Sequence, residues 1–176
     1  QSAVSFVCIS MPRFAGNGEP GCRCCDKLSG LTNSIGVMMK ATVKWVDGAM
    51  FLGESGSGHS VVMDGPEDHG GRNMGVRPME MLLLGMGGCA SFDVMSMLKK
   101  SRQQVKDCRC ELVAERVDAV PAVFETIRLH FVVTGTALKE SHVKRAVELS
   151  AEKYCSASIM MEKAGVVIEH SHEIIE

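Results

Sequence analysis

Apolar residues alternate with polar residues along several stretches of the chain, which is the pattern of a β-strand with one buried face. In the clearest example, apolar residues from Ile127 to Val133 recur at every second position. Stretches of this kind are, in chain order, 41–46, 49–53, 60–63, 108–117, 124–134 and 166–175. We therefore expect about six strands.

Two longer stretches carry apolar residues at helical spacing. The first is 78–100, where Pro78 suits the first helical position and the lysines at 99 and 100 suit the C-terminal end of the helix dipole. The second is 139–161, with an apolar stripe that includes Val143 and Val147. A polar, Gly-rich loop at 64–77 precedes the first helix. The chain is thus predicted to form an α+β domain with one central cysteine in each helix.

Residues 1–37 lack any sustained period and are rich in Gly, Ser and Cys. The patterned chain opens at Met38-Met39-Lys40. We therefore expect an N-terminal extension over 1–37, tag-like or mis-started, followed by one domain over 38–176. That domain is long enough to bury a hydrophobic core.

Composition and charge exclude several classes of partner and cofactor. The net charge of −2 gives no electrostatic reason to expect nucleic acid or an anionic membrane as a partner. No wholly apolar run reaches the roughly 18 residues of a membrane span. The eight cysteines are scattered and follow no secretory signal, which indicates a reducing cytoplasm. No phosphate-binding loop or recognised metal motif is found, so we expect neither a cofactor nor a metal.

The candidate chemistry centres on Cys89. Gly85, Gly87 and Gly88 precede it inside the first predicted helix, and each costs a helix about 1 kcal/mol relative to Ala. Glycines at such a cost indicate that another backbone or a small substrate comes close to the sulfur. Cys89 is thus a candidate reactive thiol and Cys155 its candidate partner. The alternative is that both are inert core thiols, since cysteine is among the most buried residue types.

A reactive pair of this kind has a defined chemistry. An oxidant converts a cysteine thiolate to sulfenic acid, a nearby thiol traps it as a disulfide, and a small thiol resets the pair. Several methionines, including Met86, lie near Cys89 in the sequence. Soft thioether side chains adapt to irregular hydrophobic ligands, although they also serve simply to fill a core.

Three segments carry a resemblance to a known family: ATVKWVDG at 41–48, PMEMLLLGMGGC at 78–89 and AEKYCS at 151–156. With them, residues 39–176 resemble the OsmC/Ohr family of osmotically inducible and organic hydroperoxide resistance proteins, and within it the small YhfA-like branch. The resemblance implies an OsmC-like fold in which about six strands wrap two Cys-bearing helices in an intertwined homodimer. It also implies that Cys89 is the peroxidatic thiol, that Cys155 resolves it, and that a lipoyl-type or other dithiol is the reductant.

The chain departs from the family's peroxidases at two positions. Those proteins carry an Arg in the N-terminal strand region, whereas residues 39–71 contain none. They also carry a Glu directly after the helix-opening proline, where this chain has Met79 and the acid is Glu80. One step along a helix turns a side chain by about 100°. Our hypothesis is that Arg72 or Arg77 supplies the cation, because a planar guanidinium suits a thiolate and a peroxide.

Two functions follow as expectations. The first is a cytoplasmic, thiol-dependent peroxidase of the oxidative stress response, which reduces organic hydroperoxides through Cys89 and Cys155, with Glu80, Arg77 and Met86 as further site residues. The second is a non-catalytic OsmC-like dimer that binds a small hydrophobic or thiol-containing ligand.

Overall fold

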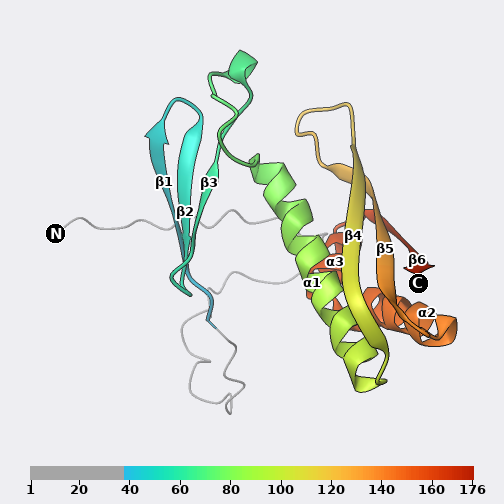
Figure 1. The fold of residues 1–176 in the computed structure, drawn as a ribbon. Coiled ribbons are helices and arrows are strands. Elements are labelled where there is room, and N and C mark those ends of the chain that lie inside the picture. The colour runs from blue at the N-terminus through green and yellow to red at the C-terminus, as the bar shows by residue number, and fades with distance from the viewer. Residues whose placement is uncertain (1–37) are drawn as a thin grey trace, which may run out of the picture. The chain divides into compact units, whose positions relative to one another are not determined.

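The computed structural model describes residues 38–176 (Figure 1). The expected extension over 1–37 lies outside the described residues, so the domain boundary after residue 37 stays a prediction. The described part of the chain contains six strands and three α-helices, which confirms the α+β prediction. The strands form two separate three-stranded sheets.

The first sheet is an antiparallel meander of β1 (Ala41–Asp47), β2 (Met50–Ser55) and β3 (Ser60–Met63). β1 turns into β2 at Gly48, which has a positive φ of 51° and lies so close to the carbonyl oxygen of Gly70 that a Cβ would stand 2.6 Å from it. Only glycine meets both conditions at low cost.

The second sheet joins β4 (Gln104–Arg116), β5 (Phe124–Thr136) and β6 (Val167–Ile175), with β5 in the middle. β4 and β5 run antiparallel, while β5 and β6 run parallel. The alternation predicted for β5 is confirmed, because its inward-facing residues are fully buried. These residues are Ile127, Leu129, Phe131 and Val133.

Helix α1 (Pro78–Lys100) lies beside β4 and also contacts the other two helices (Figure 1). Its buried stripe recurs every four residues and packs into the core with β5. The stripe consists of Met86, Ala90, Val94 and Leu98. By length and composition α1 is apolar enough to cross a membrane, with a mean hydropathy of 1.5 over 18 residues. A core helix of a soluble domain has the same property, so this is weak evidence for a membrane.

The second predicted helix, 139–161, is not continuous. The chain instead forms α2 (Glu140–Leu149), a π-helical turn η2 (Ser150–Tyr154) and α3 (Ser156–Lys163), with Cys155 between the last two. The backbone of Cys155 is extended, with φ −70° and ψ 97°. The π-turn shifts the buried face by one residue, because Tyr154 is 49% exposed and the next buried residue after Ser150 is Cys155. The apolar spacing in the sequence does not predict this shift. Isolated π-turns of this kind often mark functional sites.

The loop between β3 and α1 is held by Asp64, which is buried. Its carboxylate accepts backbone hydrogen bonds from Gly65 at 2.8 Å, Arg72 at 2.9 Å and Met74 at 3.1 Å. These bonds, led by that of Met74, lower the pKa of Asp64 below its usual value. A 3₁₀ turn, η1 (Glu67–His69), lies within the same loop.

Candidate functional site

The structure brings Cys89 and Cys155 together. The two sulfur atoms and a carboxylate oxygen of Asp93 all lie within 4.8 Å of one another. Cys89 and Asp93 are one helical turn apart on the same face of α1, whereas Cys155 comes from the break between η2 and α3. This group of three side chains is called the thiol cluster below.

The two thiols differ in accessibility. Cys89 is partly exposed, while Cys155 is 0% exposed. Burial raises the pKa of Cys155, and the neighbouring Cys89 raises it further, although two bonds from Ser158 act in the opposite direction. The thiol of Cys155 therefore stays protonated at neutral pH.

Cys155 caps the helix that follows it. Its Sγ accepts hydrogen bonds from the backbone N–H of Ser158 at 3.4 Å and from its hydroxyl at 3.1 Å. Upstream, the backbone N–H of Cys155 donates to the carbonyl of Ser150 at 2.9 Å, and the buried Ser150 hydroxyl donates to the carbonyl of Ala90 at 3.2 Å. Because Ala90 directly follows Cys89, these bonds tie the Cys155 turn to α1 beside the other thiol.

Asp93 was not found by the sequence analysis. Burial raises its pKa, and its Oδ2 is buried without a hydrogen-bond partner among the described residues. A buried carboxylate oxygen without a partner is unusual and calls for an explanation. The spacing of four residues from Cys89 was a visible signal, but only the position of Cys155 shows that Asp93 belongs to the site.

Two further thiols, Cys108 and Cys110, lie on β4 and pack against the core. Burial raises the pKa of Cys108, and it raises the pKa of Cys110 to about 11. Both are therefore protonated at neutral pH and poor nucleophiles. Cys108 provides a matched control for experiments on the thiol cluster, whereas Cys110 interacts electrostatically with Cys155.

The other predicted site residues lie elsewhere. Arg77 and Glu80 pair with each other at the start of α1, by a backbone bond of 2.9 Å and a side-chain bond of 3.0 Å. These bonds lower the pKa of Glu80. Glu80 precedes Cys89 by nine residues, which is about 13.5 Å along the helix axis. Met86 is only 1% exposed and belongs to the core, whereas Arg72 pairs with Asp47. In a single chain, then, neither Arg77 nor Glu80 reaches the thiol cluster.

Two cavities lie along α1 on the side of β4. One, of about 440 Å³, is lined by Arg77, Glu80 and residues of the loop and of β4. The other, also about 440 Å³, shares Glu80 and Leu83 with it and is lined by Cys110 and Leu112 of β4. These mostly apolar spaces lie between the start of α1 and the sheet.

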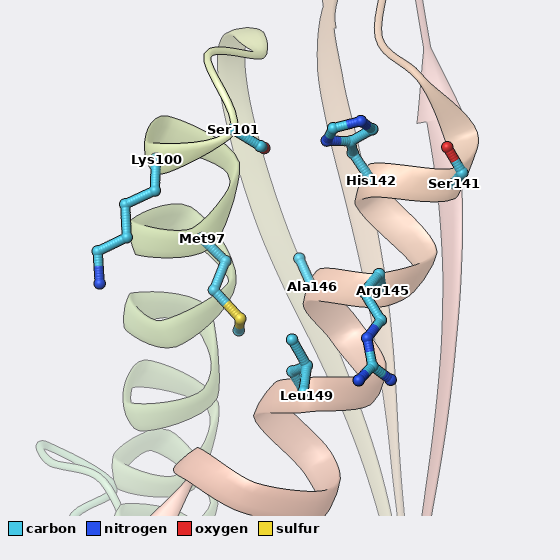
Figure 2. A pocket seen from close by; sticks show the side chains of 8 residues that line it. All are labelled: Met97, Lys100, Ser101, Ser141, His142, Arg145, Ala146 and Leu149. Carbon is cyan, nitrogen blue, oxygen red and sulfur yellow. The ribbon is translucent and has the colours of Figure 1, made fainter.

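A third cavity, of about 480 Å³, lies between the end of α1 and α2 (Figure 2). Figure 2 shows the Met97 side chain directed toward α2, with Ala146 and Leu149 facing it and the polar groups of His142 and Arg145 higher and lower along α2. Neither Cys89 nor Cys155 lines this cavity. It is therefore separate from the thiol cluster.

Comparisons with known proteins agree with this architecture. A family model described as OsmC-like protein matches residues 69–171. Protein YhfA of Escherichia coli K12 is 52% identical over 137 residues, which cover 78% of this chain and 98% of that protein. The crystal structure of a hypothetical protein from Aquifex aeolicus VF5 is 32% identical, with a TM-score of 0.68 over 78% of this chain and 96% of that one.

More distant structures share the fold. An organic hydroperoxide resistance protein OsmC from Legionella pneumophila is 16% identical, with a TM-score of 0.60 over 77% of this chain and 96% of that one. The family match covers more than half of the chain, and the E. coli relative matches it along nearly its own full length. This chain therefore belongs to the OsmC-like protein family.

Proposed function

We propose that this protein is a cytoplasmic, cysteine-based peroxidase that reduces organic hydroperoxides as a homodimer. The observation that carries the proposal is the thiol cluster, in which a partly exposed cysteine and a fully buried one place their sulfurs within 4.8 Å of each other. Relatives of the same fold from Legionella pneumophila and Bacillus subtilis are named organic hydroperoxide resistance proteins, and the fold is thus compatible with this chemistry.

The difference in accessibility between the two thiols supports a role for each. The thiolate of Cys89 attacks one peroxide oxygen, the O–O bond breaks, and the alkoxide takes a proton and leaves as an alcohol. Cys89 is then a sulfenic acid. The thiol of Cys155 attacks its sulfur, a disulfide forms, and water leaves with the Cys155 proton. A dithiol reductant restores both thiols by two exchange steps and becomes a disulfide itself.

The distance between the sulfurs of Cys89 and Cys155 suits these reaction steps. A disulfide requires an S–S separation of about 2.05 Å, so sulfurs at most 4.8 Å apart approach by less than about 2.8 Å. Cys155 lies at a break between two helical segments, not within a helix.

The homodimer is supported by apolar surface that residues 38–176 of one chain leave uncovered. On the first sheet, Trp45 is 61% exposed and shares a face with Phe51, its partner across the strands. On α1, Phe92 is 75% exposed, and both Gly85 and Gly88 face open space. Apolar patches of this kind mark interaction surfaces. A second copy would cover them and could bring a cation to the thiol cluster.

A specific observation favours the second candidate, a binding module without peroxidase activity. The two arginines that we expected to serve the thiol, Arg72 and Arg77, are paired with Asp47 and Glu80. A thiolate without a nearby cation or donor is a weaker nucleophile for peroxide. The cavities along α1 would then hold a small hydrophobic ligand instead of a substrate.

Steady-state peroxide consumption separates the two functions. tert-Butyl hydroperoxide and hydrogen peroxide are compared with dihydrolipoamide as the reductant. The wild type is expected to consume the organic peroxide faster, and Cys89→Ser to lose activity. Cys155→Ser should form a sulfenic acid that is not resolved internally, while Cys108→Ser, the matched thiol control, should behave as the wild type. No consumption by the wild type, with Cys89 and Cys155 still reduced, would refute the peroxidase proposal.

A further inference from the structure

We propose that the thiol cluster of Cys89, Asp93 and Cys155 is also a binding site for a thiophilic divalent cation of the zinc class. The inference reverses the sequence-based expectation that the chain holds no metal site. It does not depend on the peroxidase proposal, because binding requires no redox step.

The donor set fits zinc. Two thiolates and one carboxylate are ligands that Zn²⁺ takes, at about 2.3 Å for sulfur and about 2.0–2.2 Å for oxygen. In a tetrahedral site with these bond lengths, neighbouring ligand atoms lie about 3.5–3.8 Å apart. The three donor atoms lie within 4.8 Å of one another. Each pair therefore closes by at most about 1.3 Å to bind one ion.

The spacing of the ligands supports the same conclusion. Residues four apart on a helix present side chains to the same side, as the two ligands of a zinc-binding helix do. Cys89 and Asp93 have this spacing on α1. The third ligand comes from Cys155, whose turn is tied to α1 through Ser150 and Ala90. The site thus joins two segments that are already held together.

The polar surroundings fit as well. The Oδ2 atom of Asp93 is buried and without a protein partner among the described residues, and a cation would give it one. The N–H and hydroxyl of Ser158 donate to the sulfur of Cys155. Hydrogen bonds to a ligating sulfur are the usual outer shell of such sites, where they orient the ligand and stabilise its charge.

The fourth position is left for water or a small ligand. Cys89 is partly exposed, so an ion reaches the thiol cluster from the side of this thiol. Three protein ligands with one open position is the arrangement of an accessible zinc site, not of a closed structural one.

The chain also contains Cys8, Cys22, Cys24 and Cys25. The experiment must therefore distinguish metal bound by the thiol cluster from metal bound by these four cysteines. The reduced full chain is studied together with a version in which these four residues are replaced by Ser. Zn²⁺ is titrated against a chromophoric chelator, and Co²⁺ is used as a spectroscopic probe. We expect one equivalent of metal per chain in the replaced version, with a sulfur-to-cobalt charge-transfer band and the visible bands of a tetrahedral site.

The variants test each ligand. Asp93→Asn keeps the shape and both thiols, and should weaken Zn²⁺ binding by more than roughly tenfold, which is the low end of the loss for an outer-shell residue. Cys89→Ser and Cys155→Ser should each remove part of the charge-transfer band. Cys108→Ser should bind as the parent does. Circular dichroism confirms that each variant is folded.

A second readout is chemical protection of the thiol. Alkylation of Cys89 by iodoacetamide, followed by mass spectrometry, should slow in the parent protein at a Zn²⁺ concentration that just saturates it, and should slow much less in Asp93→Asn at the same Zn²⁺ concentration. The proposal is overturned if Asp93→Asn binds Zn²⁺ as tightly as the parent does, or if the cobalt charge-transfer band keeps its full intensity in both Cys89→Ser and Cys155→Ser. Peroxidase activity is measured separately, so its absence leaves this result unaffected.

Discussion

Three glycines of α1 have different surroundings, and replacing each by Ala should give different results. A Cβ at Gly85 or Gly88 would meet nothing within 4 Å. A Cβ at Gly87 would stand 2.7 Å from Cδ1 of Leu112 on β4. That distance is too short for two carbon atoms, so either the Leu112 side chain or α1 itself must move.

The magnitudes follow from two opposing effects. Replacing a helical Gly by Ala stabilises the helix by about 1 kcal/mol, and among residues 38–176 of one chain no atom opposes this at Gly85 or Gly88. At Gly87, overpacking costs about 1–3 kcal/mol. Gly87→Ala should therefore change the free energy of unfolding by between about zero and −2 kcal/mol. The two kinds of variant should differ by about 1–3 kcal/mol.

Urea unfolding followed by circular dichroism measures these differences. A second substitution tests the cause at Gly87. Leu112→Val removes both Cδ atoms, so the double variant Gly87→Ala/Leu112→Val should be more stable than the sum of the two single changes predicts. Gly87→Ala as stable as Gly85→Ala, or no coupling with Leu112, would refute the close packing of α1 on β4.

The same variants test the homodimer. The side of α1 that carries Gly85, Gly88 and Phe92 is the proposed contact with a second copy. If it is, a methyl group at Gly88 should weaken association, and sedimentation velocity should show dissociation of the Gly88→Ala dimer at a higher protein concentration than for the wild type. Gly87→Ala is the control, since Gly87 is buried within the chain. A Gly88→Ala variant with unchanged association would exclude this side of α1 from the interface.

Three further predictions follow from the hydrogen bonds and exposed surfaces of the described residues. Ser158→Ala removes a hydroxyl that donates to the Cys155 sulfur, so the pKa of Cys155 should rise further. Alkylation of Cys155 in a Cys89→Ser background should then require a higher pH, and an unchanged pH profile of alkylation would contradict this hydrogen bond. Asp64 has a lowered pKa in the folded state, so its stabilising effect is present above its unfolded pKa of about 4 and is lost as the pH falls through the lower folded value. Asp64→Asn should therefore lower the free energy of unfolding at pH 7, and the difference from the wild type should shrink under strong acid. The single tryptophan, Trp45, is 61% exposed in one chain. If a second copy covers the first sheet, dilution should shift the Trp45 emission to the red and increase its quenching by acrylamide. Quenching that does not depend on protein concentration would count against a dimer interface on this sheet.

The apolar pattern by itself determined the strands and the start of the first helix. Strand β5 buries Ile127, Leu129, Phe131 and Val133 on one face, and this period of two is visible in the sequence. Pro78 marks the start of α1 because its missing N–H costs nothing there. The flanking patterns of Cys89 and Cys155 also pointed to the family, which the comparisons support.

Only the tertiary structure decided what surrounds the two thiols. The break before Cys155 shifts the buried positions by one residue, so that Tyr154 is exposed and Cys155 is buried, and the apolar spacing in the sequence could not reveal this shift. Asp93 acquires its role only because the chain path brings Cys155 beside it, and Arg77 and Glu80 pair with each other instead of reaching Cys89. The physical reason is that periodicity records which side of a segment is buried, whereas contacts between distant segments depend on how the whole chain packs.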